Sequence, residues 1–475
     1  MAHYDMLVIG TGPAGQKAAV QSAKLGKRVG IIERHEVVGG VCINSGTIPS
    51  KSLREAVLYL SGFHQRSLYG STYRVKKDIA MEDLAFRANH IITEEIQIIQ
   101  DQMARNHVDL IFGTARFVDP HRLAVIRHNG TVEHTADHIV IAVGTKPARP
   151  PDVPFDGHSI IDTDELLTLK ALPKSLIIIG GGVIGSEYAS IFAMMGIQVV
   201  LIDRRPRLLE FVDTEIIEAL QRQLRDIGVT LYHDEEVVAI TKAPDGQVEL
   251  RLHSGMQLTA STVMYSAGRM GASDELNLDV VGIKTDERGR LPVNKQYQTV
   301  VPHIYAAGDV IGFPALASTS MQQGRLAACH AFGLHYEVRT QLLPIGIYTI
   351  PEISMVGPTE QELMQQQIHY EVGIARYREI ARGKLIGDDI GMLKLLFHSQ
   401  TRQLLGVHAI GEGATELIHI GQAVMAHGGK IDYFVDNVFN YPTLAECYMV
   451  AALAGLNRLP RPWLPENLAT KQGTI

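Results

Sequence analysis

Two glycine-rich segments carry residue types suited to holding a dinucleotide. Each places glycine at its first, third and sixth positions, and an acidic residue follows 23 positions after the first glycine. These residues are Gly10, Gly12, Gly15 and Glu33 in the first segment, and Gly180, Gly182, Gly185 and Asp203 in the second. The first glycine permits a tight turn, the second lets backbone approach a pyrophosphate, and the acid can accept a hydrogen bond from a ribose. The pattern predicts two dinucleotide-binding sites.

Positioning these residues requires a strand, a helix and a second strand in each segment. Apolar runs at 6–9 and 175–179 precede the glycines, and apolar runs at 29–32 and 199–202 lead to the acids. This order predicts a βαβ unit in which phosphates lie at a helix N-terminus, where free N–H groups favour negative charge. One such motif would be weak evidence, because glycine-rich turns also arise for conformational reasons. Two copies in the same register indicate a duplicated fold.

The composition fits an α/β enzyme of several domains. The chain has 475 residues, of which 46% are hydrophobic and 20% charged. Its net charge of −7 and the lack of a long Lys/Arg block argue against a nucleic-acid partner. The N-terminus lacks a basic leader, and no apolar stretch reaches membrane-spanning length. We therefore expect a cytoplasmic protein that acts on small molecules and has no membrane partner.

Cysteines and histidines give little support for metal or structural disulfide chemistry. The three cysteines are Cys42, Cys329 and Cys447, and none belongs to a CxxC pair. Neither a secreted disulfide framework nor a zinc site is expected from them. His134 and His138 stand four positions apart ahead of an expected strand, without a third ligand in view. We expect no metal site.

The second half of the chain shows a linker and then a change of pattern. An apolar strand is expected at 139–143, and the prolines that follow it predict a linker near 148. Small and apolar residues predict a helix at 318–330. From 341 onward, strands at 391–397 and 404–409 are interleaved with helices such as 414–427. This part is expected to be of the α+β class.

Together these segments resemble the pyridine nucleotide-disulfide oxidoreductase family over residues 4–459. Residues 39–51 are similar to the family's redox-active segment, and residues 348–357 to the opening strand of its C-terminal domain. The resemblance implies an α/β fold with two Rossmann-like dinucleotide-binding domains, for FAD and NAD(P), and a C-terminal α+β dimerisation domain. The expected parts are 1–147 and 276–340 for FAD, 148–275 for NAD(P), and 341–475 for the interface of a homodimer, with higher homo-oligomers left open.

The resemblance also implies which residues bind the cofactors and take part in the redox chemistry. In this family the first glycine motif binds the ADP half of FAD, and the second binds the nicotinamide nucleotide. The cofactor-binding set expected here is Gly10, Gly12, Pro13, Ala14, Gly15, Glu33, Arg34, Gly40, Val41, Cys42, Lys51, Ala142, Gly144, Thr145, Gly180, Gly182, Val183, Ile184, Gly185, Glu187, Asp203, Arg204, Arg205, Gly268, Arg269, Gly308, Asp309 and Ala317. The catalytic set is Lys51, Glu187, Cys42, Thr47, Tyr441 and Glu446. Lys51 and Glu187 match the family's ion pair beside the flavin N5.

Two positions depart from the disulfide-reducing members of the family. Thr47 stands where they carry the second redox cysteine, and Tyr441 stands where they carry a histidine paired to the glutamate that Glu446 matches. A dithiol passes on two electrons because one thiolate attacks and the other resolves. A hydroxyl cannot complete that cycle, and tyrosine is a poorer general base than histidine at neutral pH. The electrons must leave to something other than a disulfide.

A second nicotinamide is the remaining acceptor, which predicts transhydrogenation. NADPH would reduce FAD and leave as NADP⁺, and NAD⁺ would then collect the hydride in a ping-pong cycle. Residues 42–56 and 439–443 resemble the signatures of the transhydrogenase members of this family. Asp203 suits the ribose of NAD(H), and the arginines at 204, 205 and 207 suit the 2′-phosphate of NADP(H). The sequence does not decide which arginine meets the phosphate.

Three other functions stay open at this point. The reduced flavin could pass its electrons to a quinone, as in a diaphorase. Disulfide chemistry like that of dihydrolipoamide dehydrogenase could persist through an unusual pair such as Cys42 and Cys447 across a dimer interface. The chain could also be a nucleotide-sensing module that binds without turnover. Lys51 could likewise be an exposed charge, and Cys42 a small buried side chain.

Overall fold

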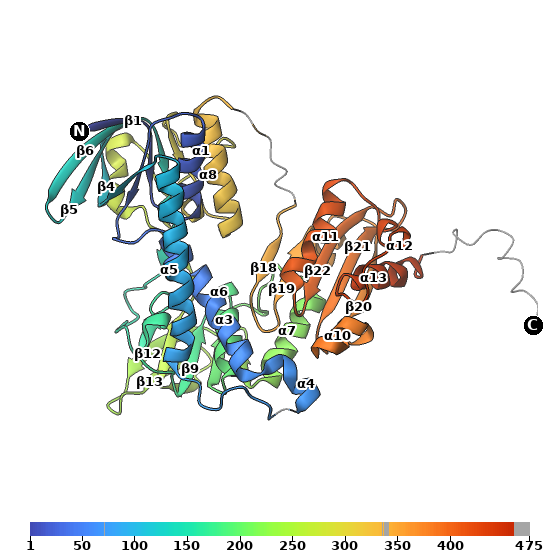
Figure 1. Cartoon of the computed structure of the whole chain (residues 1–475). Coiled ribbons are helices and arrows are strands. Elements are labelled where there is room, and N and C mark those ends of the chain that lie inside the picture. The colour runs from blue at the N-terminus through green and yellow to red at the C-terminus, as the bar shows by residue number, and fades with distance from the viewer. Residues whose placement is uncertain (71, 335, 337–341, 460–475) are drawn as a thin grey trace, which may run out of the picture.

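The first predicted βαβ unit is present in the computed structural model, which describes residues 1–70, 72–334, 336 and 342–459 (Figure 1). Strands β1 (Ala2–Ile9) and β2 (Val29–Glu33) pair in parallel, and helix α1 (Pro13–Lys24) connects them. Pro13 opens the helix at a position where an N–H would have no intrahelical partner. Most apolar residues of both strands are buried, and the two strands lie in the interior of a seven-stranded sheet.

The rest of this sheet combines parallel and antiparallel strands. Its order is β3-β2-β1-β6-β5-β4, and β17 also pairs with β6. The added strands are β3 (Asp109–Phe112), β4 (Thr114–Asp119), β5 (Arg122–Arg127), β6 (Gly130–Ile141) and β17 (Ile304–Ala306). The expected strand at 139–143 was wrong at its start, since β6 begins at Gly130. Its first half pairs antiparallel with β5 and is partly exposed, so the apolar run marks only the buried half.

The second predicted unit forms a separate parallel sheet. Strands β9 (Ser175–Ile179) and β10 (Gln198–Ile202) flank helix α6 (Val183–Met194), and the sheet order is β11-β10-β9-β15-β8. Its other elements are β8 (Ile160–Asp162), α7 (Thr214–Asp226), β11 (Val229–Tyr232) and β15 (Thr262–Tyr265). An antiparallel sheet of β12 (Val237–Lys242), β13 (Val248–Leu252) and β14 (Gln257–Ala260) follows in the chain. The duplicated fold predicted from the sequence is confirmed.

A short antiparallel ribbon connects the two parallel-sheet regions. Strand β7 (Thr145–Pro147) pairs with β16 (Arg269–Gly271), close to the chain positions where a linker was expected. The domain boundaries expected at 147/148 and 275/276 stay predictions. The domain boundary expected at 340/341 lies outside the described residues.

The C-terminal part is an antiparallel sheet flanked by helices, as the α+β pattern predicted. The strand order is β18-β19-β22-β21-β20. The elements are β18 (Ile345–Ile347), β19 (Ile353–Val356), β20 (Tyr370–Arg376), β21 (Met392–His398), β22 (Leu404–Ile410), α11 (Ala414–Ala426) and α13 (Glu446–Leu456). In the described part of the chain, no helix is long and apolar enough to cross a lipid bilayer.

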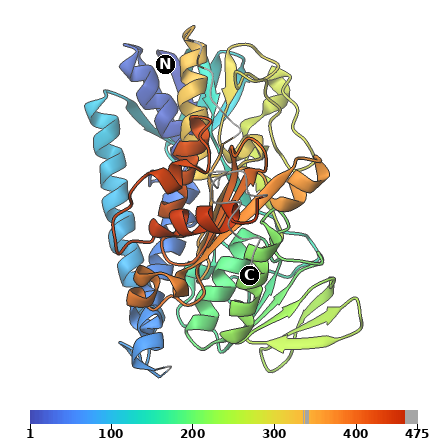
Figure 2. The ribbon, with the colours of Figure 1, turned by 90° about the vertical axis from the view of Figure 1, so that its right-hand side faces the viewer.

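Three further helices pack beside the parallel-sheet regions. Helix α8 (Ala317–Ala331), expected at 318–330, packs closely on α1, where a side chain at Gly324 would overlap the backbone of Ala14. Helix α3 (Thr47–Ser61) follows the short α2 (Gly40–Asn44). The long helix α5 (Met81–Arg105) runs from the first sheet toward the second in both views (Figure 2).

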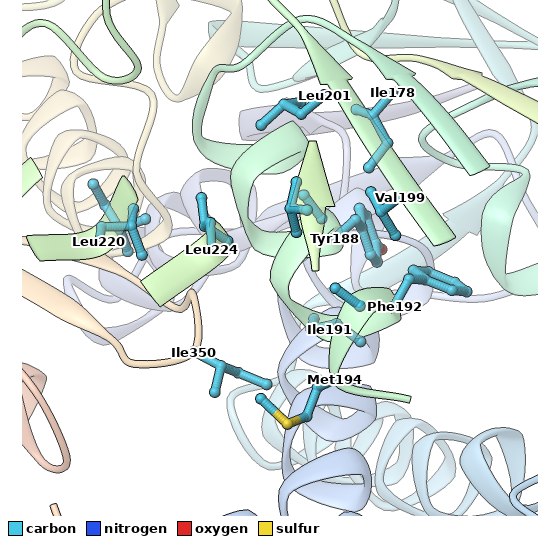
Figure 3. Close-up of a cluster of buried hydrophobic side chains, with 14 of the residues drawn as sticks. Ile178, Tyr188, Ile191, Phe192, Met194, Val199, Leu201, Leu220, Leu224 and Ile350 are labelled. Carbon is cyan, nitrogen blue, oxygen red and sulfur yellow. The ribbon is translucent and has the colours of Figure 1, made fainter. Parts of the chain in front are cut away.

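A shared apolar core joins α3, α6, α7 and the C-terminal sheet. Tyr188, Phe192 and Met194 of α6 are buried in it, as is Ile350 (Figure 3). Lys394 of β21 is fully buried and lies 2.8 Å from Asp213, the N-cap residue of α7. Although burial opposes the charge, hydrogen bonds to carboxylates raise the pKa of Lys394, so it stays charged. The C-terminal sheet is thereby fastened to the second unit.

Candidate dinucleotide and redox site

A cavity of about 700 Å³ lies where the first glycine motif ends and α1 begins. Its walls come from the ends of β1 and β2, from α2 and from the turns after β6 and β17. The predicted cofactor residues that line it are Gly10, Gly12, Pro13, Ala14, Glu33, Arg34, Gly40, Val41, Cys42, Ala142, Gly144, Thr145, Gly308, Asp309 and Ala317, together with Thr47 of the catalytic set. One elongated ligand could contact all these segments.

The three glycines of the first motif have different physical reasons to be glycine. Gly10 has a φ of +103°, and a Cβ there would overlap the carbonyl of Ala142. A Cβ on Gly15 would overlap the carbonyl of Gly10, since helix and strand approach closely. Gly12 has an ordinary φ of −66°, and no atom of the described chain lies within 4 Å of a Cβ built on it. The chain itself therefore does not require glycine at position 12, whereas a ligand in the cavity would.

The second motif repeats this geometry. Gly180 has a φ of +107°, and a Cβ on Gly185 would overlap the carbonyl of Gly180. Gly182 has a φ of −73°, and a Cβ on it meets nothing within 4 Å in the described residues. Val183 and Ile184, which open α6, are only half-buried. Both helix N-termini are therefore free to receive an anionic group.

Glu33 at the end of β2 is held in place by backbone and side-chain donors. Its Oε2 accepts hydrogen bonds from the amide (3.2 Å) and hydroxyl of Thr11, and its Oε1 accepts one from the amide of His35 (3.0 Å). Sequence reasoning missed Thr11 and His35, which also line the cavity. The place of Thr11 between the first two glycines of the motif was the feature of the sequence that could have pointed to it.

Asp203 occupies the equivalent position in the second unit and is tied to one arginine. Its Oδ2 accepts a hydrogen bond from the amide of Gly181 at 2.5 Å, and its carboxylate accepts two from the Arg205 guanidinium at 2.9 and 2.6 Å. Burial opposes ionisation, but these donors hold the pKa of Asp203 below its ordinary value. Arg204 is exposed and has no ion-pair partner among the described residues. The two adjacent arginines are therefore not equivalent.

Lys51 and Glu187 form a direct ion pair between the two units. The Lys51 Nζ lies 2.7 Å from the Glu187 Oε2, and the Glu187 side chain is only 5% exposed. The other carboxylate oxygen accepts a hydrogen bond from the Tyr348 amide at 2.9 Å, and the Lys51 Nζ lies 4.9 Å from the centre of the Tyr348 ring. Helices α3 and α6 and the C-terminal part thus jointly fix the position of one ammonium group.

Cys42 and Thr47 lie against each other at the cavity wall. The Cys42 thiol of α2 interacts with the Thr47 side chain at the start of α3. Burial raises the pKa of Cys42, so its nucleophilic thiolate is scarce at neutral pH. Cys42, Cys329 and Cys447 are all free thiols. The side chain facing the cysteine is a hydroxyl, which forms no disulfide with it.

Three other residues of the predicted cofactor-binding set, Asp309, Arg269 and Gly268, lie at or near the cavity. Asp309 accepts a hydrogen bond from the Ser320 hydroxyl at 3.2 Å, and burial raises the pKa of Asp309. The Arg269 guanidinium binds Thr145 and, at 3.0 Å, the carboxylate of Asp164. Gly268 has a φ of +122° just before β16. In the described residues no group of three or more potential ligands is placed to hold a metal ion.

Family models match most of the chain. The pyridine nucleotide-disulphide oxidoreductase model matches residues 4–324, and the dimerisation-domain model of that family matches residues 343–452. The chain belongs to this family.

Relatives in this family are similar over nearly the full length. A soluble pyridine nucleotide transhydrogenase of Mycobacterium bovis (strain BCG / Pasteur 1173P2) is 55% identical over 463 residues, which are 97% of this chain and 98% of the relative. One of Vibrio parahaemolyticus is 46% identical, covering 96% and 99%. Among solved structures, LpdA from Mycobacterium tuberculosis matches with a TM-score of 0.87 at 24% identity, covering 95% of this chain and 99% of LpdA. The HOCl-induced flavoprotein disulfide reductase RclA from Escherichia coli matches at 0.85 and 28% identity, covering 95% and 99%.

Two residues of the catalytic set lie in the family's dimerisation domain. Tyr441 is 72% exposed, and neither it nor Glu446 lines the cavity of its own chain. Glu446 is the first residue of α13, and its Oε2 is buried without a hydrogen-bond partner in the described residues. The roles of Tyr441 and Glu446 stay predictions, since one chain does not bring them to the other site residues.

Proposed function

We propose that this protein is a transhydrogenase that moves hydride between NADPH and NAD⁺ through FAD, in a ping-pong cycle and without a redox disulfide. The observation that carries the proposal is the contact between the Cys42 thiol and the Thr47 hydroxyl at the wall of a dinucleotide cavity. A flavoenzyme with Thr47 at this position lacks the cysteine pair that would accept electrons from the flavin as a disulfide. The most similar family members described above carry the transhydrogenase name.

The residues around the cavity fit FAD. Gly12 leaves room for backbone to approach a pyrophosphate, the N-terminus of α1 supplies free N–H groups, and Glu33 is positioned for a ribose. Bound FAD would supply a hydride acceptor and donor at N5. Lys51, held by Glu187 and Tyr348, would present a fixed positive charge to the ring system. Asp203 and Arg204 would receive the adenosine ends of NAD(H) and NADP(H).

Anaerobic mixing tests the function directly. The purified flavoprotein is reduced with NADPH, separated from nucleotide, and mixed with NAD⁺ while the flavin absorbance is recorded. We expect bleaching in the first step and full recovery in the second. Recovery with a quinone but not with NAD⁺ would instead establish a diaphorase, and a flavin that never bleaches would establish a binding module.

Disulfide chemistry through Cys42 and Cys447 finds no support in the geometry. Cys447 is fully buried within the dimerisation domain, and burial raises the pKa of Cys447 to about 12. A thiol that is neither exposed nor ionised reacts slowly in thiol–disulfide exchange. Turnover of lipoamide by the purified protein would contradict the proposal.

Replacing Gly12 by alanine is expected to impair FAD retention without harming the fold. The added Cβ meets no atom of the described chain and enters the space where a pyrophosphate would approach. We expect at least ~10-fold weaker FAD binding by the Gly12→Ala variant, measured as the flavin-to-protein ratio and by FAD titration of apoprotein. Gly182→Ala is the matched control, because it makes the same change in the second unit and should leave FAD content normal. Normal FAD binding by Gly12→Ala would contradict the assignment.

Replacing Thr47 by serine is expected to leave hydride exchange within about twofold of wild type, because the flavin and not this hydroxyl carries the chemistry. Steady-state reduction of thio-NAD⁺ by NADPH measures the effect. A collapse of the rate with normal flavin content would indicate covalent or acid–base chemistry at position 47.

A homodimer in the cytoplasm completes the proposal. The matched dimerisation domain supports the dimer, with its exposed apolar side chains Tyr433, Val438, Tyr441 and Leu453 as candidates for burial. The description of its relatives as soluble supports the cytoplasmic location. Higher assembly stays open.

A further inference from the structure

A second cavity, of about 280 Å³, lies where helices α3 and α6 both end. Residues from α3, from the segment after it and from α6 line this cavity, which we call the Arg66 pocket. They include Ser61, Arg66, Arg74, Lys77, Asp78 and Met194. Its volume is many times that needed for one water molecule. The Arg66 pocket shares no lining residue with the dinucleotide cavity.

Most of the charged side chains that line the Arg66 pocket are positive. Three cations, Arg66, Arg74 and Lys77, face a single carboxylate, Asp78. Neither Arg74 nor Lys77 forms an ion pair with any residue that the structure describes. The pKa of Arg66 is lowered by its burial and by the nearby charge of Arg74. Such a group of cations is stabilised when an anion joins it.

Arg66 also has an unused buried donor. One guanidinium nitrogen donates to the Ser61 carbonyl at 3.0 Å, and another contacts the Met194 sulfur at 3.7 Å. Its Nε is buried and has no hydrogen-bond partner among the described residues. One cation at the end of each helix, α3 and α6, would suffice to offset the two helix dipoles. The positive charge that remains favours a ligand with several acceptor oxygens.

Backbone contacts fix the segment that carries Arg74 and Lys77. The amides of Val75 and Lys76 both donate to the Leu60 carbonyl at 3.1 Å. Gly62, with a φ of +65°, ends α3. Lys76 is directed elsewhere, because its Nζ pairs with Asp83 at 2.6 Å. The Arg66 pocket is therefore held in shape by the chain.

We propose that the Arg66 pocket binds a small oxyanion of the phosphate class and that this binding is coupled to the Lys51–Glu187 pair. Lys51 precedes Ser61 on α3 by about 15 Å along the helix axis. Glu187 and Met194 lie on the same helix, α6, whose buried face is shown in Figure 3. An anion that contacts the ends of both α3 and α6 would therefore influence the positions of both Lys51 and Glu187. The coupling rests on the proposed function, whereas the binding does not.

Titration with inorganic phosphate tests the binding. The purified full-length protein is titrated calorimetrically at ionic strength held constant with potassium chloride. We expect one saturable site per chain, with affinity at least ~10-fold weaker in the double variant Arg74→Ala/Lys77→Ala. The matched control Lys284→Ala/Arg288→Ala removes two exposed charges without an ion-pair partner in the described chain, and it should bind like wild type. Arg204→Ala should also bind like wild type.

Two binding results would overturn the proposal. One is the absence of saturable phosphate binding, and the other is wild-type affinity in Arg74→Ala/Lys77→Ala. Loss of binding in Arg204→Ala alone would assign the phosphate to the nucleotide site instead and would also refute the Arg66 pocket.

The rate of flavin reduction by NADPH, with and without saturating phosphate, tests the coupling. A change of about twofold or more that is absent in Arg74→Ala/Lys77→Ala is expected. Phosphate binding with an unchanged rate would refute the coupling. A protein without flavin would refute the proposed function while the titration still decides the site.

Discussion

Replacing Lys51 by methionine is expected to slow flavin reduction by NADPH by about 100-fold. The Lys51 ammonium is held by Glu187 at 2.7 Å and lies over the Tyr348 ring, so its charge is fixed before any substrate arrives. A preorganised charge stabilises developing negative charge more than a solvated one, because it needs no rearrangement during the reaction. Methionine keeps much of the apolar stem and removes the charge. Stopped-flow absorbance of the flavin measures the rate.

The control for Lys51→Met is Lys76→Met, which breaks an ion pair of similar length, 2.6 Å, between Lys76 and Asp83 on the surface. Exposed pairs contribute little to stability, so Lys76→Met should reduce flavin at the wild-type rate. Glu187→Gln should give an intermediate effect, since it keeps a hydrogen-bond acceptor for Tyr348 but loses the charge that positions Lys51. Equal rates for wild type and Lys51→Met would remove Lys51 from the catalytic set.

The predictable part of this molecule is the part encoded by local patterns. Each βαβ unit follows from an apolar run, spaced glycines and an acid, all within about 25 residues, and each is present as expected. Helix α8 and strands β21 and β22 were also located to within a residue or so, because apolar periodicity and turn residues mark them. Strand β6 was placed too late, because its exposed half has no apolar signal.

Contacts between distant segments could not be derived from spacing. Lys51 and Glu187 are 136 residues apart, and only the family resemblance paired them. Lys394 stands in the strand that was expected at 391–397, and its carboxylate partners Asp213 and Glu360 come from two other segments. The Arg66 pocket likewise forms only when α3 and α6 pack side by side. Such sites depend on tertiary packing, which the pattern of one segment does not contain.

Arg204→Ala is expected to separate the two nucleotide substrates, because Arg204 and Arg205 have different partners. Arg205 makes two hydrogen bonds to Asp203 through its guanidinium and a third through its amide, at 2.9, 2.6 and 2.8 Å. Arg204 is exposed and has no ion-pair partner in the described part of the chain. Arg204 is therefore the group available to a 2′-phosphate, whereas Arg205 orients the carboxylate that suits the ribose of NAD(H).

The expected result is a fall of about 10- to 100-fold in kcat/KM for NADPH, since a charge-assisted hydrogen bond contributes about 1.5–3 kcal/mol. The value for NADH should change by less than about threefold, because NADH has no phosphate at that position. Arg207→Ala is the matched control in the same loop: Arg207 already donates to the Thr214 hydroxyl at 2.9 Å, so neither substrate should be affected. Arg205→Ala should impair both substrates by releasing Asp203. Selective loss of NADPH activity in Arg205→Ala, with Arg204→Ala unchanged, would assign the 2′-phosphate to Arg205 instead of Arg204. The ion pair between Arg205 and Asp203 would then have to open whenever NADP(H) binds.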